Sequence, residues 1–235
     1  MNIGIVPLVD YAFKMMLGNQ HHPHITIHFL NAVLAEKYRI TSIEFTDPST
    51  LQLIPDDKLS VLHIVATEEH GKRLNIEIQI ALPAGMPQIL GFLAGRGLVN
   101  QSPDPLLSPE LRPSICICIL ASRLFPETQA LQLDFQMRHD NQSQPLSDLL
   151  QIYVLQLGNL HATEDTVATA TPLERWAWFL RYASQLTSEQ VARLLPDTEI
   201  SNAAQILETI AHNPLQLAEY NTRLKAKHNQ VAAML

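Results

Sequence analysis

The chain has few residues that could cross-link it or bind phosphate through the backbone. Its 235 residues include only two cysteines, Cys116 and Cys118. They stand too close along one extended apolar run to favour a disulfide, and no CxxC or Cys/His spacing indicates a zinc site. We expect buried free thiols in a reducing cytosol. The eight glycines form no phosphate-binding loop and no Gly-x-Ser-x-Gly nucleophile motif.

Long apolar runs and an excess of positive charge are also absent. No run is long enough to cross a membrane, and the N-terminus MNIGIVPLVD lacks the basic flank and apolar core of a signal peptide. We therefore expect a cytoplasmic protein with no membrane partner. A hydrophobic content of 46% with 17% charged residues is typical of a globular protein. The chain has a net charge of −7, so it would need a local basic patch or bound metal ions to bind a polyanion such as DNA.

One stretch, KLSVLHIVATEEHGKRLNIEIQIAL at residues 58–82, organises the rest of the chain. Apolar residues alternate on both sides of a charged turn that contains Gly71, which predicts a β-hairpin. The first strand is apolar on both faces except at His63, so we expect it to be buried. The second strand is apolar on one face and carries Asn75, Glu77 and Gln79 on the other.

Glu77 and Gln79 therefore point the same way from a buried strand. A buried glutamate costs several kcal/mol unless it is paired or bound to a cation. The plain interpretation is structural, with His63 a hydrogen-bonded core histidine and Glu77 a half-exposed strand residue. The alternative is that these side chains form a functional site.

The remaining pattern predicts helices and strands in mixed order. We expect helices over residues 8–18, 25–37 and 87–101, and strands over 40–53, 114–120, 131–138 and 150–157. A loop through Pro55, Asp56 and Asp57 should lead into the hairpin. The run SICICIL at 114–120 is apolar on both faces, as in a central strand. From Thr171 four helices follow, two of them with capping-box starts at Thr171 and Thr187.

Two polar groups near the N-terminus admit a structural or a functional interpretation. Asp10 and Lys14 stand four apart on one helix face, where an exposed ion pair is the simplest outcome. His21, His22 and His24 surround Pro23 and could ligate a metal, but no second cluster of ligands accompanies them.

Several of these motifs, in this order, resemble one nuclease family. They are Asp10-Tyr11-Ala12-Phe13-Lys14, Phe29 to Leu34 (FLNAVL), KLSVLHIVA, NIEIQ, and Glu174 to Leu180 (ERWAWFL). Together they resemble the Rpn-type family of recombination-promoting nucleases and transposases, within the PD-(D/E)XK nuclease superfamily. The resemblance spans nearly the whole chain.

The resemblance implies a restriction-endonuclease-like α/β fold, a mixed sheet flanked by helices, with a C-terminal all-helical extension. We place the nuclease-like domain at residues 1–165 and the helical region at 171–235. It also implies DNA as the partner and Mg²⁺ or Mn²⁺ as the cofactor. A homo-oligomer is left open.

The resemblance further implies a site on the central hairpin. In the family an aspartate on the first strand and a glutamate on the second hold a divalent cation, and a lysine or glutamine two residues on positions the attacking water. Here Glu77 matches the metal-binding glutamate and Gln79 its polar partner. Asp10 and Lys14 match a helix motif near the site, Asp10 as a metal ligand and Lys14 as a catalytic residue.

The chain departs from that pattern at His63, which takes the place of the aspartate. Magnesium prefers oxygen ligands in octahedral geometry, and losing an anionic ligand removes charge that balances the cation. We expect weakened magnesium binding and activity lower by orders of magnitude, with manganese better tolerated. Gln156 and Asn159, where relatives would carry a glutamate and a lysine, are a second departure.

Three hypotheses follow. In the first, the chain is a metal-dependent DNA endonuclease, impaired by His63: Asp10 and Glu77 hold the cation, His63 ligates it or acts as a base, and Gln79 orients the water. In the second, it is a catalytically inactive relative that binds DNA or protein. In the third and weakest, His63 and Glu77 form a zinc or manganese site.

Overall fold

The computed structural model describes residues 1–34, 37–46, 61–80, 86–101, 111–139 and 144–232. By their contacts these residues form two units, each built from separate segments of the chain. Unit 1 comprises Met1–Lys37, Ala121–Leu131 and Gln156–Leu235, and unit 2 comprises Tyr38–Leu120 and Gln132–Leu155. Each is described here by itself.

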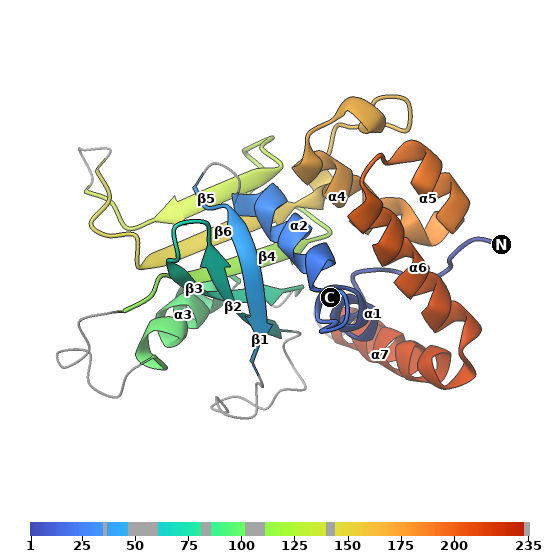
Figure 1. The fold of residues 1–235 in the computed structure, drawn as a ribbon, viewed down its shortest axis with the longest axis horizontal. Helices are drawn as coiled ribbons and strands as arrows, with labels where there is room; N and C mark the ends of the chain where they lie inside the picture. The colour runs from blue at the N-terminus through green and yellow to red at the C-terminus, as the bar shows by residue number, and fades with distance from the viewer. Residues whose placement is uncertain (35–36, 47–60, 81–85, 102–110, 140–143, 233–235) are drawn as a thin grey trace. The chain divides into compact units, whose positions relative to one another are not determined.

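Unit 2 is built on a six-stranded sheet with the order β1-β2-β3-β4-β6-β5 (Figure 1). Its strands are β1 (Ile40–Phe45), β2 (Val61–Glu68), β3 (Arg73–Gln79), β4 (Ser114–Leu120), β5 (Gln132–Gln136) and β6 (Leu150–Gln156). β1, β2 and β3 pair antiparallel, whereas β3 and β4 pair parallel. The expected mixed sheet is thus confirmed.

The predicted hairpin is present between β2 and β3. The backbone N–H of Gly71 donates to the Glu68 carbonyl at 2.9 Å, and that of Glu68 donates to the Lys72 carbonyl at 3.0 Å. Gly71 has a φ of +85°, a left-handed conformation that glycine adopts without steric cost. The turn sets the register, in which His63 lies directly opposite Glu77.

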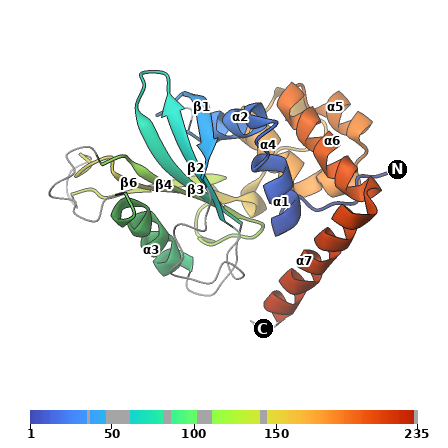
Figure 2. The same ribbon diagram turned by 60° about the horizontal axis from the view of Figure 1, so that its bottom comes forward.

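The parallel pair β3–β4 is joined by α3 (Met86–Val99), which lies against the sheet (Figure 2). Parallel strands require such a crossover because the chain must return to the starting end of the sheet before the next strand, which a tight turn cannot do. β4 is buried along its whole length, as its two-sided apolar pattern predicts. Cys116 and Cys118 on this strand are buried and free, which confirms the expectation of free thiols.

Unit 1 is helical and contains helices from both the N-terminal and the C-terminal parts of the chain (Figure 1). The N-terminal helices are α1 (Asp10–Leu17) and α2 (Pro23–Leu34), and the C-terminal helices are α4 (Pro172–Tyr182), α5 (Ser188–Leu194), α6 (Thr198–His212) and α7 (Pro214–Ala232). α1 packs on α6 and α7, and α2 packs on α4 and α6. Short 3₁₀ turns occupy Leu157–Asn159, Val167–Thr169 and Ala183–Gln185.

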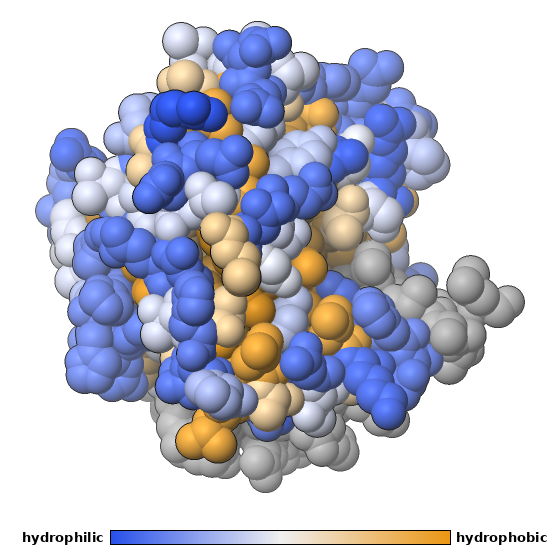
Figure 3. Space-filling view, turned by 90° about the vertical axis from the view of Figure 1, so that its right-hand side faces the viewer, coloured by the Kyte–Doolittle hydropathy of each residue, from blue (hydrophilic) through white to orange (hydrophobic). Residues whose placement is uncertain are grey.

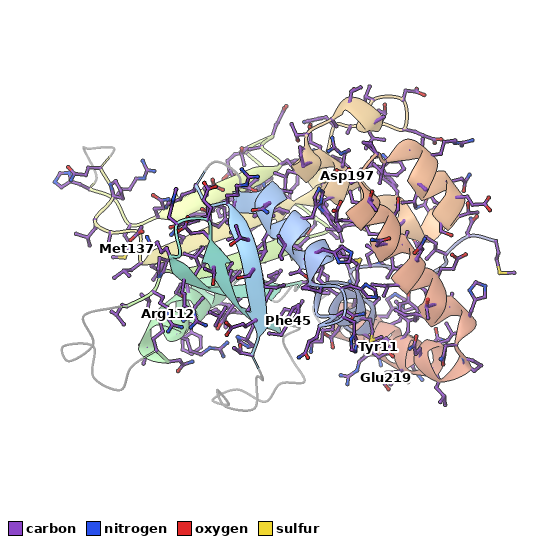
Figure 4. The ribbon with its side chains drawn as sticks, in the orientation of Figure 1. Tyr11, Phe45, Arg112, Met137, Asp197 and Glu219 are labelled. Atoms are coloured by element: carbon purple, nitrogen blue, oxygen red, sulfur yellow. The ribbon has the colours of Figure 1, made fainter. Side chains whose placement is uncertain are left out.

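Trp176 of α4 is the centre of the unit 1 core. It is fully buried, and its ring meets Phe29 and Phe179 edge to face at centroid distances of 5.5 and 5.8 Å. Its indole N–H donates to His28 Nδ1 at 2.9 Å, which satisfies the buried donor. Beside it Arg175 pairs with Asp197, which precedes α6 (Figure 4).

The element boundaries differ from the predicted ones at a few ends. Both predicted capping boxes are present, at Thr171 with Glu174 and at Thr187 with Gln190. α2 begins earlier than expected, because Pro23 is well suited to the first turn of a helix, where its missing N–H is not needed. β5 ends at Gln136, short of its predicted limit, whereas residues 47–53 of the strand predicted over 40–53 lie outside the described residues. The predicted loop through residues 55–57 also lies outside the described residues.

Within the part of the chain that the structure describes, no helix combines the length and apolar character that crossing a membrane requires.

Candidate functional site

The polar face of the hairpin continues across three strands of unit 2. Because register pairs point to the same side of a sheet, His63 of β2, Glu77 of β3 and Cys116 of β4 share one face. Gln79 and Cys118 form the next row, and Asn75 and Ser114 the row before. α3 covers this face, so the side chains are enclosed between helix and sheet.

Glu77 is the buried charge at the centre of this face. Its side chain is only 10% exposed. This excludes the interpretation in which Glu77 is a half-exposed strand residue. His63 Nδ1 lies 3.4 Å from Glu77 Oε1, and the His63 side chain is 9% exposed. The structure therefore brings together the two residues that the hairpin pattern had singled out.

A third residue completes the cluster. Nη2 of Arg96, on α3, lies 3.3 and 3.4 Å from the two carboxylate oxygens of Glu77. The Arg96 side chain is 10% exposed, so the ion pair is largely shielded from water. We refer to His63, Glu77 and Arg96 as the Glu77 cluster.

The helix that carries Arg96 is held close to the sheet. A Cβ on Gly97 would lie 2.2 Å from Ser114 Oγ and 4.0 Å from Glu77 Oε1, so only glycine permits this approach. The Ser114 hydroxyl donates to the Ala94 carbonyl at 2.8 Å. The Gln101 amide donates to the carbonyls of Gly97 and Arg112 at 3.0 and 2.8 Å (Arg112 is labelled in Figure 4). These contacts fix the position from which Arg96 reaches Glu77.

Gln79 is fully buried, and its carboxamide hydrogen-bonds the Cys118 thiol. Burial raises the pKa of Cys118 to about 12 despite that bond. The pKa of Cys116 is raised well above its usual value, first by burial and then by the neighbouring Cys118 and Glu77, with Arg96 acting in the opposite direction. Both thiols are therefore protonated and unreactive in the folded protein.

The other predicted site residues belong to unit 1. Asp10 and Lys14 form the expected pair on α1, with Lys14 Nζ 3.2 Å from Asp10 Oδ1. Gln156 Oε1 accepts from the backbone N–H groups of Leu124 and Phe125 at 2.7 and 2.8 Å. The Asn159 amide donates to the carbonyls of Thr128 and Ala130 at 3.0 and 2.9 Å. Gln156 and Asn159 thus organise the segment that precedes β5.

A family model described as PD-(D/E)XK nuclease family transposase matches residues 7–234. The chain belongs to this family. Its restriction-endonuclease-like α/β fold, with a mixed sheet, flanking helices and C-terminal helices, agrees with that membership. Comparison with curated proteins and with solved structures gave no significant match.

PD-(D/E)XK nucleases use divalent metals, and the Glu77 cluster does not fit one. It offers a single carboxylate, and that carboxylate is already bound by a guanidinium. Mg²⁺ prefers several oxygen ligands. A cation on Glu77 would also face Arg96, at a repulsion of about 4 kcal/mol per pair of unit charges 4 Å apart in a partly shielded site. Among the described residues no group of three or more His, Cys, Asp or Glu side chains could hold a metal, the histidines around Pro23 included.

The sequence pattern assigns no role to Arg96, although Arg96 is the residue that pairs with Glu77. The predicted helix over 87–101 was weakened by glycines and carried an arginine among apolar residues. That isolated charge was the available signal, but the partner of Arg96 is decided by how the helix crosses the sheet.

Proposed function

We propose that this chain is a PD-(D/E)XK family protein that has lost metal-dependent phosphodiester hydrolysis and acts by binding DNA. One observation carries the proposal: the buried Glu77 carboxylate is paired with the Arg96 guanidinium, and the His63 imidazole lies 3.4 Å from it. Hydrolysis in this class needs a cation that acidifies water and clamps the phosphate. A carboxylate already bound by a guanidinium is a poor ligand for that cation. Membership of a nuclease family suggests DNA as the ligand.

The decisive experiment compares plasmid cleavage by the wild-type protein and Glu77→Gln, each with Mg²⁺ and with Mn²⁺. We expect no cleavage above background from either protein. Binding of a labelled duplex, followed by fluorescence anisotropy, should be detectable at low salt and weaken as salt rises. Cleavage by the wild-type protein that Glu77→Gln abolishes would establish an endonuclease and overturn the proposed loss of hydrolysis.

A protein partner is the second candidate, favoured by how the basic residues are used. Within the described residues, seven lysines and arginines are found in ion pairs with Asp or Glu: Lys14, Arg39, Lys72, Arg73, Arg96, Arg175 and Arg223. A lysine or arginine whose charge is balanced by a neighbouring carboxylate attracts DNA phosphates less strongly. Apolar side chains also gather in a band on one face of the molecule (Figure 3). Failure to bind duplex DNA at any salt concentration would leave this candidate.

A further inference from the structure

The Glu77 cluster raises the question of how a carboxylate is tolerated beneath a helix. An isolated buried charge is strongly unfavourable, and a carboxylate therefore needs a cation at close range. His63 meets this need only when it is protonated, whereas a guanidinium carries its charge at every physiological pH. Arg96 is the permanent positive charge that contacts Glu77.

The packing of α3 is specific for this contact. Gly97, next to Arg96, has no room for a side chain against Ser114. Gly91 and Gly95 of the same helix have open space around the positions of their missing Cβ atoms. Among these three glycines, only Gly97, next to Arg96, is required by close packing on the sheet.

We propose that Arg96 is the built-in cation of this site: its guanidinium takes the role that a divalent metal has in the family and excludes such a metal from Glu77. This inference rests on the proposed loss of metal-dependent hydrolysis and names the residue that selects against the cation. Restoring an aspartate at position 63 then does not by itself restore a metal site, because the arginine still occupies the carboxylate. Both the imidazole and the guanidinium must be replaced.

The test measures Mn²⁺ binding by the electron paramagnetic resonance signal of the free ion, in four full-length proteins. These are wild type, His63→Asp, His63→Asp/Arg96→Met and the matched control His63→Asp/Arg96→Lys, which keeps the positive charge. We expect the Arg96→Met double variant to bind Mn²⁺ at least tenfold more tightly than the other three. Adding Glu77→Gln to that double variant should abolish the gain.

Equal Mn²⁺ binding by His63→Asp and by the Arg96→Met double variant would overturn the inference. This outcome differs from failure of the proposed function, which is cleavage of DNA by the wild-type protein.

Thermal unfolding covers the case in which removal of Arg96 prevents folding. Arg96→Met should lower the melting temperature by several degrees or unfold unit 2, because Glu77 is left buried without its cation. Arg96→Met/Glu77→Gln should recover most of that loss. An Arg96→Met protein as stable as wild type in a chelator would also overturn the inference, since Glu77 would not need the guanidinium.

Discussion

Glu77 has two nitrogen partners of different character, and the difference decides what each can do. The Arg96 guanidinium is always charged, whereas the His63 imidazole is charged only when protonated. Arg96 therefore gives Glu77 a permanent positive partner that does not depend on a metal. His63 fills the cross-strand position that an aspartate would take in the family, where a second carboxylate would have raised the need for a cation.

The raised pKa values of the β4 thiols, Cys116 and Cys118, predict that the protein loses stability at alkaline pH. The unfolded chain releases their protons near pH 8.5 to 9, whereas burial raises the folded pKa of Cys118 to about 12. Stability is therefore fully present below about pH 9 and decreases as pH rises through the folded pKa. The loss is up to about 1.4 kcal/mol per pH unit for each buried thiol.

Urea unfolding at pH 8 and pH 10 measures this loss, and Cys118→Ala is the comparison. The variant loses packing at both pH values but should show a smaller fall between them. A residual fall is expected because burial also raises the pKa values of Cys116 and Tyr153. Identical falls in wild type and variant would contradict the assignment to Cys118.

At the scale of elements, α3 combines two kinds of glycine. Gly97 is required by close packing on Ser114, whereas Gly91 faces open space. Glycine weakens a helix by about 1 kcal/mol relative to alanine, so a glycine with free space around it is replaceable. The two positions form a matched pair on one helix.

We predict opposite effects for Gly97→Ala and Gly91→Ala. The first should destabilise unit 2 by about 1–3 kcal/mol, because the new methyl group overlaps the Ser114 hydroxyl. The second should stabilise it by up to about 1 kcal/mol. Denaturant unfolding gives both values. Ser114→Ala should recover part of the Gly97→Ala loss, and destabilisation by Gly91→Ala would argue that its face is covered.

The β2–β3 hairpin supplies a second prediction at this scale. Glu68 Oε1 accepts from the backbone N–H of Lys72 at 2.8 Å, and this bond lowers the pKa of the Glu68 carboxyl. The stabilisation is present above the unfolded pKa of about 4.3 and is lost as pH falls through the lowered folded value. Glu68→Gln should be less stable than wild type at pH 7, and the difference should vanish in acid. Melting curves across pH 2–7 test this, and a difference that persists unchanged at low pH would refute it.

At the scale of the whole molecule, the helical unit is assembled from both ends of the chain. Contacts group α1 and α2 with the C-terminal helices, although about 140 residues of sequence separate them. Lys227 of α7 donates from its partly buried ammonium to the Leu8 carbonyl at 2.6 Å, and the hydroxyl of Tyr220 accepts from the N–H of Val6 at 2.9 Å. The boundary between residues 165 and 171 stays a prediction, and these contacts argue against independent folding of the segment after it.

We predict that residues 171–235 do not fold as an isolated fragment. Trp176 would lose Phe29 and His28, its partners from α2, and α6 and α7 would lose α1. Circular dichroism should show low helicity without a cooperative melt, and tryptophan emission should resemble that of the denatured protein. Adding a peptide of residues 1–37 should raise both signals. A cooperative transition of the fragment alone would contradict the prediction.

The sequence by itself determined the local structure. Period-two alternation, Gly71 in the turn and the capping boxes at Thr171 and Thr187 are short-range signals, and the hairpin and C-terminal helices followed from them. The same alternation placed Glu77 on the polar face opposite His63, since a hairpin turn sets its own register.

Only the tertiary structure decided which side chain from outside the hairpin contacts Glu77. Arg96 lies 19 residues along the chain, and its contact depends on how closely α3 crosses the sheet at Gly97. The grouping of α1 and α2 with α4 to α7 is equally invisible in a linear pattern. Helical periodicity identifies which face of a helix is apolar but not which surface covers it, because that choice is made by packing between segments distant in sequence.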